Sequence, residues 1–257
     1  MAHKSEDSAP PVEEPRPNLG SPLRVVFNSL AIFILSQSVA VFLLGFLLSA
    51  AHPGIGVAQN LETAPSQFFY VLLAEGLAVC LVVWILKKRH LSLNAIGWGR
   101  RLKFSDITKA LSGFVVFYIF LIIATVILSF LFPGLNTNQT QDVGFNHLNS
   151  SLDQVLALVA LIILPPLGEE ILVRGYLYTG LRSKVRFLPA ALITSLLFGL
   201  AHVTTGSDTS LLWDAGVATF ILSMVLVYLR ETTGALYAGM ILHGLNNLVA
   251  FGVHFHR

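Results

Sequence analysis

A few ionisable side chains lie inside long apolar segments of this 257-residue sequence, whereas most charged residues lie between those segments. A charge at the centre of a helix in lipid costs roughly 2.5–3.5 kcal/mol, so each such residue is a candidate for a functional site. The residues of this kind are Glu75, Glu169, Glu170, Arg174, His202 and His243. Carboxylate and imidazole groups together can activate a water molecule for hydrolysis by general acid–base chemistry.

Two adjacent carboxylates precede an arginine in the segment EEILVR, residues 169–174. In a helix with ~100° between successive residues, positions 170 and 174 share a face. Glu170 and Arg174 are therefore expected to pair at i,i+4 and to neutralise each other. Glu169 points elsewhere, and a carboxylate in a dry site beside a second carboxylate can accept a proton near neutral pH. The pattern favours Glu169 as a general base, although the three side chains could also serve only to link helices.

Two histidines each lie four residues from a side chain on the same helical face. Phe198 precedes His202 by four positions, which places His202 beneath an aromatic ring. Asn247 and, slightly less well, Asn246 lie beside His243. A histidine and an asparagine on one face can donate hydrogen bonds to the oxyanion that develops when a peptide bond is hydrolysed.

The prolines Pro165 and Pro166, followed by Gly168, come shortly before the two carboxylates. Proline removes a backbone donor and clashes with the preceding turn, so we expect a break or kink here. Such a break frees carbonyl groups and makes room for water at membrane depth. Hydrolysis inside a membrane requires a pocket of this kind.

Long apolar helices are the elements that must position these residues. Hydrophobic residues make up 54% of the sequence and charged residues only 12%, against about 25% charge in a typical soluble domain, which excludes an ordinary water-soluble fold. The apolar runs are continuous and do not alternate as the strands of a membrane barrel do. They predict an all-α, polytopic transmembrane helical bundle with about seven spans, or eight if one segment is hidden. The predicted spans are roughly 25–51, 67–86, 107–132, 154–180, 188–203, 211–229 and 234–251.

Connectors that contain lysine or arginine alternate along the chain with connectors that contain neither. Seven of these residues lie from Lys87 to Lys109, whereas none lies in 52–66 or 133–153. The positive-inside rule then predicts a cytoplasmic N-terminus in a multi-pass protein of the cell membrane. The same rule accounts for the net charge of +2, so the sequence argues against nucleic acid as a partner.

Three motifs occur in order within apolar segments: EExxxR at 169–174, FxxxH at 198–202 and HxxxN at 243–247. Together they resemble the CPBP family of intramembrane glutamic endopeptidases. That family includes the CAAX-processing Ras-converting enzymes and bacterial proteins linked to bacteriocin processing and self-immunity. The resemblance covers about residues 150 to 250. The sequence thereby divides into a disordered cytoplasmic tail, N-terminal transmembrane helices and a CPBP-like catalytic transmembrane core, at 1–22, 23–149 and 150–257 respectively.

The resemblance implies a role for each matching position. Glu169 would act with His202 to activate the water that attacks a peptide carbonyl. His243 and Asn247 would stabilise the tetrahedral oxyanion. The supporting residues would be Glu170, Arg174, Phe198 and Asn246. Val173 departs from the phenylalanine that many members have before the arginine.

The mechanism that the resemblance implies uses no metal or other cofactor. Two glutamates and two histidines could ligate a metal, but the sequence lacks the HExxH spacing of a zinc protease. The expected partners are the lipid bilayer and a peptide or protein substrate at the membrane, with or without a lipid anchor.

The alternative is a non-catalytic membrane protein, such as an immunity factor, an assembly partner or a proton-coupled carrier, in which the same residues form a buried polar network. A carrier should line a path across several helices, whereas nearly all of these residues fall in three predicted spans, which favours the enzyme. Glu75 is the exception, and we expect it to hydrogen bond to a neighbouring helix or to pair with Arg174.

Glu169 and His202 must lie at similar depths in the membrane if they act on one water molecule. At 1.5 Å per residue, straight fourth and fifth spans would place Glu169 and His202 about 12 Å apart in depth within a ~30 Å core. A break at Pro165, a tilted or half-inserted fifth span, or an offset start must close this gap if the two side chains act together.

Overall fold

The computed structural model describes residues 17–54, 56–133, 144–146, 148–203 and 212–255. Within these ranges the regular elements are helices, without a β-strand, so the predicted all-α class is confirmed there. Residues 1–16 of the expected cytoplasmic tail lie outside the described part of the chain.

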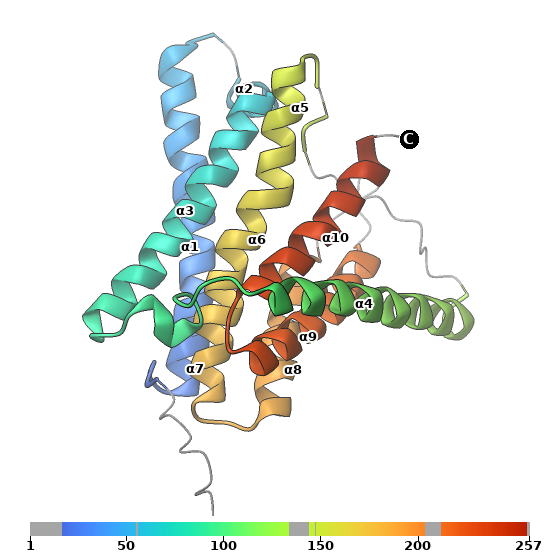
Figure 1. Ribbon diagram of the computed structural model, residues 1–257. Helices are drawn as coiled ribbons and strands as arrows, with labels where there is room; N and C mark the ends of the chain where they lie inside the picture. The colour runs from blue at the N-terminus through green and yellow to red at the C-terminus, as the bar shows by residue number, and fades with distance from the viewer. Residues whose placement is uncertain (1–16, 55, 134–143, 147, 204–211, 256–257) are drawn as a thin grey trace, which may run out of the picture.

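The first two long helices, α1 (Pro22–Ala51) and α3 (Ala64–Lys88), pack side by side (Figure 1). Each begins with a hydroxyl cap followed by a proline in the first turn: the Ser21 side chain accepts a hydrogen bond from the Arg24 nitrogen, and Thr63 does the same for Ser66. Such caps satisfy backbone donors that a helix leaves free at its start. A short helix, α2 (Val57–Leu61), lies between them.

A helical rod of several segments, 151–182, forms the centre of the molecule and contacts α1, α3, α8, α9 and α10. It begins at a capping box in which Ser150 and Asp153 satisfy each other's backbone donors. Two of its segments have π-helical hydrogen bonding. The segments are α5 (Ser151–Leu158), η2 (Val159–Ile163, π), α6 (Leu164–Glu169), η3 (Glu170–Tyr178, π) and α7 (Thr179–Arg182).

The predicted break at Pro165 and Pro166 takes the form of a π-helical turn, and the rod continues through it. Neither proline has a backbone hydrogen to donate four residues back, so the carbonyls of Leu161 and Ile162 lose their usual partners. Widened turns of this kind occur mostly at functional sites. The expected break is therefore not present in the rod, the expected kink stays a prediction, and the two prolines leave the two carbonyls without their usual donors.

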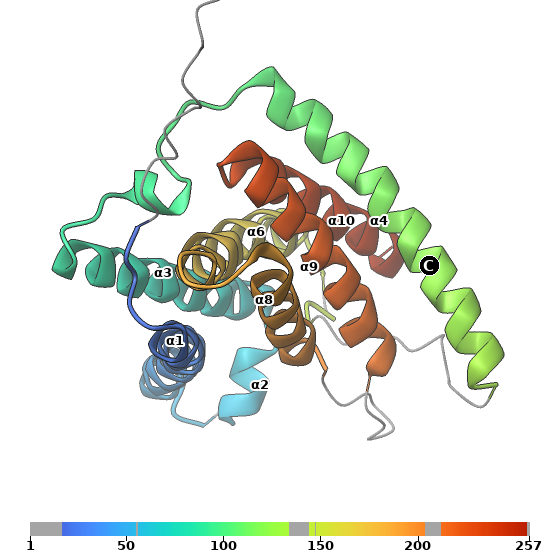
Figure 2. The same ribbon diagram turned by 90° about the horizontal axis from the view of Figure 1, so that it is seen from below.

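The remaining helices pack around one side of the rod. α8 (Phe187–Ala201) lies along α9 (Trp213–Thr233), and α4 (Phe104–Leu131), α9 and α10 (Tyr237–Phe255) lie against one another. Figures 1 and 2 show that α4 runs across the bundle instead of along α1.

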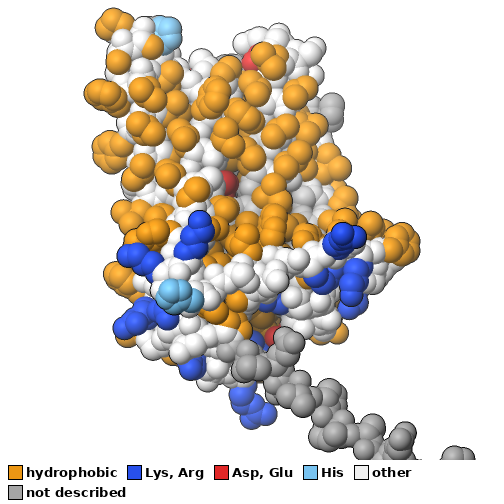
Figure 3. All heavy atoms as spheres, turned by 60° about the vertical axis from the view of Figure 1, so that its left-hand side comes forward, with side chains coloured by type: hydrophobic (Ala, Val, Ile, Leu, Met, Phe, Trp, Pro, Cys, Tyr) orange, Lys and Arg blue, Asp and Glu red, His pale blue; other side chains and the backbone are white. Residues whose placement is uncertain are grey.

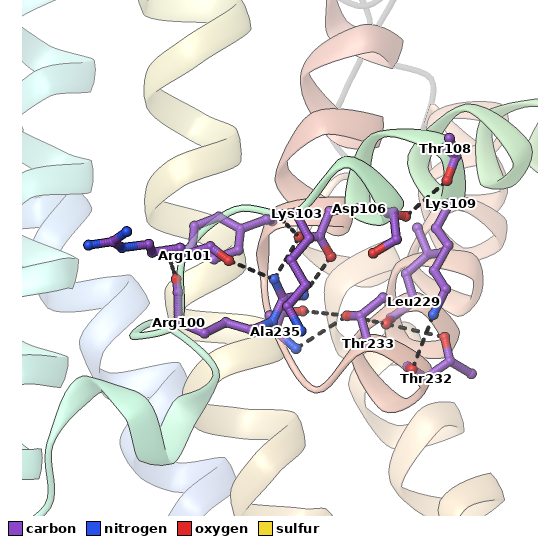
Figure 4. Close-up of polar contacts among 12 residues, drawn as sticks. Arg100, Arg101, Lys103, Asp106, Thr108, Lys109, Leu229, Thr232, Thr233 and Ala235 are labelled. Carbon is purple, nitrogen blue, oxygen red and sulfur yellow. Dashed lines mark hydrogen bonds and ion pairs between the residues drawn. The ribbon is translucent and has the colours of Figure 1, made fainter.

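The connector between α3 and α4 packs against the turn that joins α9 and α10 (Figure 4). The Leu236 nitrogen donates to the Gly97 carbonyl at 3.1 Å, and the Tyr237 hydroxyl donates to the Arg100 carbonyl at 2.6 Å. Arg100 in turn binds both oxygens of Asp106 at 2.5 and 2.7 Å, near the start of α4. These contacts hold the beginning of α10, the helix that carries His243.

Each of the seven predicted apolar segments corresponds to a helix. Within the described ranges, five helices are long and apolar enough to cross a membrane, as expected of a multi-pass membrane protein. α8, with 15 residues, is too short for that criterion, and α10 is not among the five, which agrees with the polar side chains in its middle. The five are Pro22–Ala51, Ala64–Lys88, Phe104–Leu131, Ser151–Arg182 and Trp213–Thr233.

Candidate active site

The predicted site residues from three helices line one cavity of about 270 Å³. Glu169 comes from the end of α6, His202 from the residue that ends α8, and His243 and Asn247 from α10. The other lining residues are Leu161, Pro165, Thr219, Leu222, Asn246, Ala250, Phe251 and His254. The structure therefore brings together side chains that are far apart in the sequence.

The structure brings His202 and Glu169 together despite the gap in depth that straight, parallel spans would leave. His202 lies at the end of α8 and reaches the same cavity as Glu169. The 15 residues of α8 extend about 22 Å, less than the ~30 Å hydrocarbon core. The tilted or half-inserted fifth span and the offset start that the sequence suggested stay predictions.

The expected pair of Glu170 and Arg174 is present and is fully buried. Arg174 Nη1 lies 2.9 Å from Glu170 Oε1, and the guanidinium carbon lies 4.3 Å from the centre of the Phe198 ring. The same Glu170 oxygen lies 3.3 Å from His243 Nδ1. Glu170 therefore connects the rod to α10 and orients the His243 ring.

A glycine allows this close approach between the rod and α10. A β-carbon placed on Gly239 would lie 2.8 Å from Glu170 Oε2, a distance that real β-carbons do not tolerate. Sequence reasoning did not assign a function to Gly239, because the need for a glycine arises only when the two helices are packed.

Glu169 is the glutamate with a carboxylate oxygen available to act as a base. Its Oε2 lies 3.8 Å from His243 Nε2 and has no hydrogen-bond partner among the described residues. The side chain is 23% exposed, whereas that of Glu170 is 1% exposed. Of the two neighbouring glutamates, Glu169 is the one that can accept a hydrogen bond from a water molecule in the cavity.

His202 is held by the last turn of its own helix. Its Nδ1 lies 2.8 Å from the Phe198 carbonyl oxygen, and the two rings stack with centres 4.7 Å apart. Because a carbonyl oxygen only accepts hydrogen bonds, we assign the ring proton to Nδ1. Nε2 then presents a lone pair.

Asn247 contacts one of the carbonyls that the prolines set free. Its side-chain nitrogen donates to the Leu161 oxygen at 2.9 Å. Asn246 makes longer contacts, 3.4 Å to Asn247 and 3.5 Å to the Tyr118 hydroxyl. Neither the Leu161 carbonyl nor Tyr118 was predicted, because no local sequence pattern links them to α10.

A second, smaller cavity of about 70 Å³ adjoins the first and is almost entirely apolar. It shares Glu169 and His202 with the polar cavity, so these two side chains lie where an apolar and a polar space meet. The contribution of α1 to it was not predicted. The other lining residues are Ser29, Leu30, Phe33, Leu172, Val173, Leu177, Leu197, Phe198 and Ala201.

The expectation that Glu75 pairs with Arg174 is wrong. Arg174 pairs with Glu170, and Glu75 packs against Gly168, where a β-carbon would lie 2.0 Å from Glu75 Oε2. No side chain in the described ranges forms a hydrogen bond or ion pair with Glu75. The reason is geometric: α3 packs along the rod, and Glu75 lies beside Gly168, which comes six residues before Arg174.

The comparison with family models matches this part of the chain. Residues 151–249 match the model described as Rce1-like, type II CAAX prenyl endopeptidase Rce1-like. This segment is similar to that family. The Rce1-like segment begins with the first residue of the central rod and contains each of the three motifs, in agreement with the resemblance drawn from them. No curated protein and no solved structure matches the chain.

Proposed function

We propose that the protein is an intramembrane endopeptidase of the CAAX type that hydrolyses its substrate with a glutamate-activated water. One observation carries the proposal: Glu169, His202, His243 and Asn247, from three separate helices, line a single cavity. The match of residues 151–249 to the Rce1-like model supports the same class of activity. The catalytic core is then the segment 150–257, and the helices of 23–149 surround it.

In the proposed reaction, the attacking water binds between Glu169 Oε2 and His202 Nε2, two acceptors to which no residue in the described ranges donates a hydrogen bond. Glu169 takes one proton from the water as its oxygen bonds to the substrate carbonyl carbon. Glu169 then gives this proton to the leaving amine as the carbon–nitrogen bond breaks. The products are a carboxylic acid and an amine, and the base returns to its starting state.

The oxyanion would be bound by His243 and Asn247, which line the same cavity as Glu169. The Nδ1 atom of His243 faces Glu170 at 3.3 Å, so Nε2 is the nitrogen available to the oxyanion, provided that it carries a proton. Asn247 uses one side-chain hydrogen for the Leu161 carbonyl and retains a second. Two fixed donors of this kind are the usual means of stabilising a tetrahedral intermediate.

We propose that the substrate is a membrane-associated peptide or protein with an apolar group next to the bond that is cleaved. The apolar cavity reaches the same two residues that would activate the water. A CAAX segment, with a prenylated cysteine followed by aliphatic residues, has this chemistry, and the matching family model is that of a type II CAAX prenyl endopeptidase.

We further propose seven crossings of the cell membrane, with α8 and α10 completing the set, and a cytoplasmic N-terminus. α1 begins at the lower end of Figure 1, whereas α10 ends toward the upper end, as an odd number of crossings requires. Lysine and arginine gather toward the lower end of the face seen in Figure 3, and hydrophobic side chains cover the rest of it. The positive-inside rule places that lower end in the cytoplasm.

The proposed mechanism is independent of metal ions, and a chelator tests that part directly. Full-length protein purified in detergent would be incubated with a peptide library that includes prenylated and unprenylated CAAX sequences. We expect cleavage that is unaffected by chelator and is lost in Glu169→Gln. Cleavage abolished by chelator would replace the glutamate mechanism with a metal mechanism, and absence of cleavage by folded protein would favour a non-catalytic polar network.

A further inference from the structure

Glu75 on α3 is an acidic side chain at membrane depth that the proposed reaction does not use. Its carboxyl group lies directly against the backbone of α6: a β-carbon on Gly168 would lie 2.0 Å from Oε2 and 3.0 Å from Cδ. Gly168 immediately precedes Glu169. A third carboxyl group is therefore packed beside the helical turn that carries the candidate base.

The carboxyl groups of Glu75 and Glu169 come from two helices that pack together, α3 and α6, and no cation among the described residues is paired with Glu75. Glu75 is within Coulombic range of Glu169 on α6 and of Tyr70 on its own helix. The Tyr70 hydroxyl donates to Gln37 of α1, which is uncharged.

The charged groups on the other elements that pack against α3 bind partners other than Glu75. On η3, Glu170 and Arg174 bind each other at 2.9 Å. On α5, Asp153 caps its own helix through the backbone nitrogens of Asn149 and Ser150. Among the described residues, Glu75 has no basic partner.

Two neighbouring carboxylates in a medium of low polarity cannot both be ionised without a large cost, so such a pair retains a proton. Glu169 opens on the cavity that also holds His202 and His243, whereas Glu75 lies between α3 and the backbone of α6. The negative charge is better solvated on Glu169. The shared proton therefore belongs on Glu75.

We propose that Glu75 is a positioning residue of the candidate active site: it retains the proton of the Glu75–Glu169 pair and so keeps Glu169 ionised to receive the proton of the attacking water. This inference rests on the proposed function, in which Glu169 is the base. The proton on Glu75 is not consumed. Water gives its proton to Glu169, and Glu169 passes it to the leaving amine.

The first test is the pH profile of kcat/KM for Glu75→Gln, which keeps the size of the side chain but cannot ionise. Near pH 7 we expect kcat/KM within about threefold of the wild-type value. At alkaline pH the wild type loses activity as Glu75 ionises and adds a second negative charge near Glu169, which disfavours formation of the oxyanion. This loss moves upward by at least about one pH unit in the variant. Glu75→Asp restores an ionisable group and should bring the profile back toward the wild type. A profile that is unchanged, or that is scaled equally at every pH, would overturn the inference.

The second test needs no substrate. Infrared spectra of the full-length protein, in a detergent without ester or carboxyl groups, report the carbonyl band of a protonated carboxyl group. We expect this band at neutral pH in the wild type and in the control Glu62→Gln, which removes an exposed carboxyl group between α2 and α3, and its loss in Glu75→Gln. A band that persists in Glu75→Gln, or that is missing from the wild type, would overturn the inference. Loss of the band in a protein that hydrolyses no peptide would keep the proton on Glu75 and reject the proposed function alone.

Discussion

Asn247 on α10 donates a hydrogen bond of 2.9 Å from its side chain to the backbone carbonyl of Leu161 in the central rod. In a regular α-helix that carbonyl would accept from the backbone nitrogen of residue 165, which is a proline and has no hydrogen to give. The asparagine of one helix therefore takes the place of a backbone donor in another. This contact ties the helix of His243 to the helix of Glu169.

Replacement of Asn247 with alanine removes this bond together with a proposed oxyanion donor. We expect kcat to fall by about 10²–10³-fold, and the unpaired Leu161 carbonyl to cost about 1–3 kcal/mol of stability. Initial rates and thermal unfolding in detergent measure the two effects. Asn246→Ala is the matched control, because the contacts of Asn246 are 3.4 and 3.5 Å long, and it should cost less than tenfold. Equal losses from the two variants would contradict the role given to Asn247.

Pro165→Ala tests the contact between Asn247 and the Leu161 carbonyl by changing the helix that carries the carbonyl. The new backbone N–H can bind the Leu161 carbonyl and compete with Asn247. We expect kcat to fall by about tenfold, the equivalent of one ordinary hydrogen bond, with no loss of thermal stability. Pro166→Ala restores a donor for Ile162, whose carbonyl lies against Gly244, a residue without a side-chain donor, so kcat should change less. An equal loss from Pro166→Ala would show that the prolines act only on the shape of the helix.

Glu170→Gln removes the carboxylate partner of a fully buried arginine. Breaking a buried pair from one side costs about 3–5 kcal/mol, so we expect a large drop in unfolding free energy in mixed detergent micelles. Glu231→Gln is the control, since Glu231 pairs with Arg182 at side-chain exposures of 30% and 20%, where a pair contributes about 1 kcal/mol or less. A drop for Glu170→Gln no larger than that of the control would mean that the ion pair does not hold the core.

Gly239→Ala should disturb the contacts of Glu170 with Arg174 and His243 without changing any charge. The new β-carbon would lie 2.8 Å from Glu170 Oε2, so the carboxylate must move away from α10 and from His243. We expect both the melting temperature and kcat to fall. On the same helix, Gly252 has no atom within 4 Å of such a β-carbon, and Gly252→Ala should be neutral or stabilising by up to about 1 kcal/mol. A wild-type melting temperature and rate in Gly239→Ala would show that the close packing is not needed.

Contacts that depend on helical spacing could be predicted from the sequence. Glu170 and Arg174 form the ion pair expected at i,i+4, and His202 stacks under Phe198, four residues earlier. The seven apolar segments are helices because continuous apolar runs in a chain with so little charge leave the backbone few other ways to satisfy its hydrogen bonds. The catalytic roles assigned to these residues stay predictions.

Contacts between helices could not be predicted, because no local pattern encodes them. Gly168 accommodates Glu75 and Gly239 accommodates Glu170, yet in the sequence each is an ordinary glycine in an apolar run. The pairing of Glu75 with Arg174 was expected from their opposite charges, and it is absent because Glu75 lies beside Gly168 and Arg174 pairs with Glu170. The π-helical turns follow from the loss of backbone donors and from tertiary packing, which periodicity does not report.

The central claim is that Glu169, and not its neighbour Glu170, activates the water. We would measure single-turnover hydrolysis and the melting temperature on the same preparations of wild type, Glu169→Gln and Glu170→Gln. General-base catalysis predicts a loss of about 10²–10⁴-fold in the rate for Glu169→Gln, with the melting temperature unchanged, whereas Glu170→Gln lowers the melting temperature. A Glu169→Gln protein that keeps more than a tenth of the wild-type rate would contradict the claim.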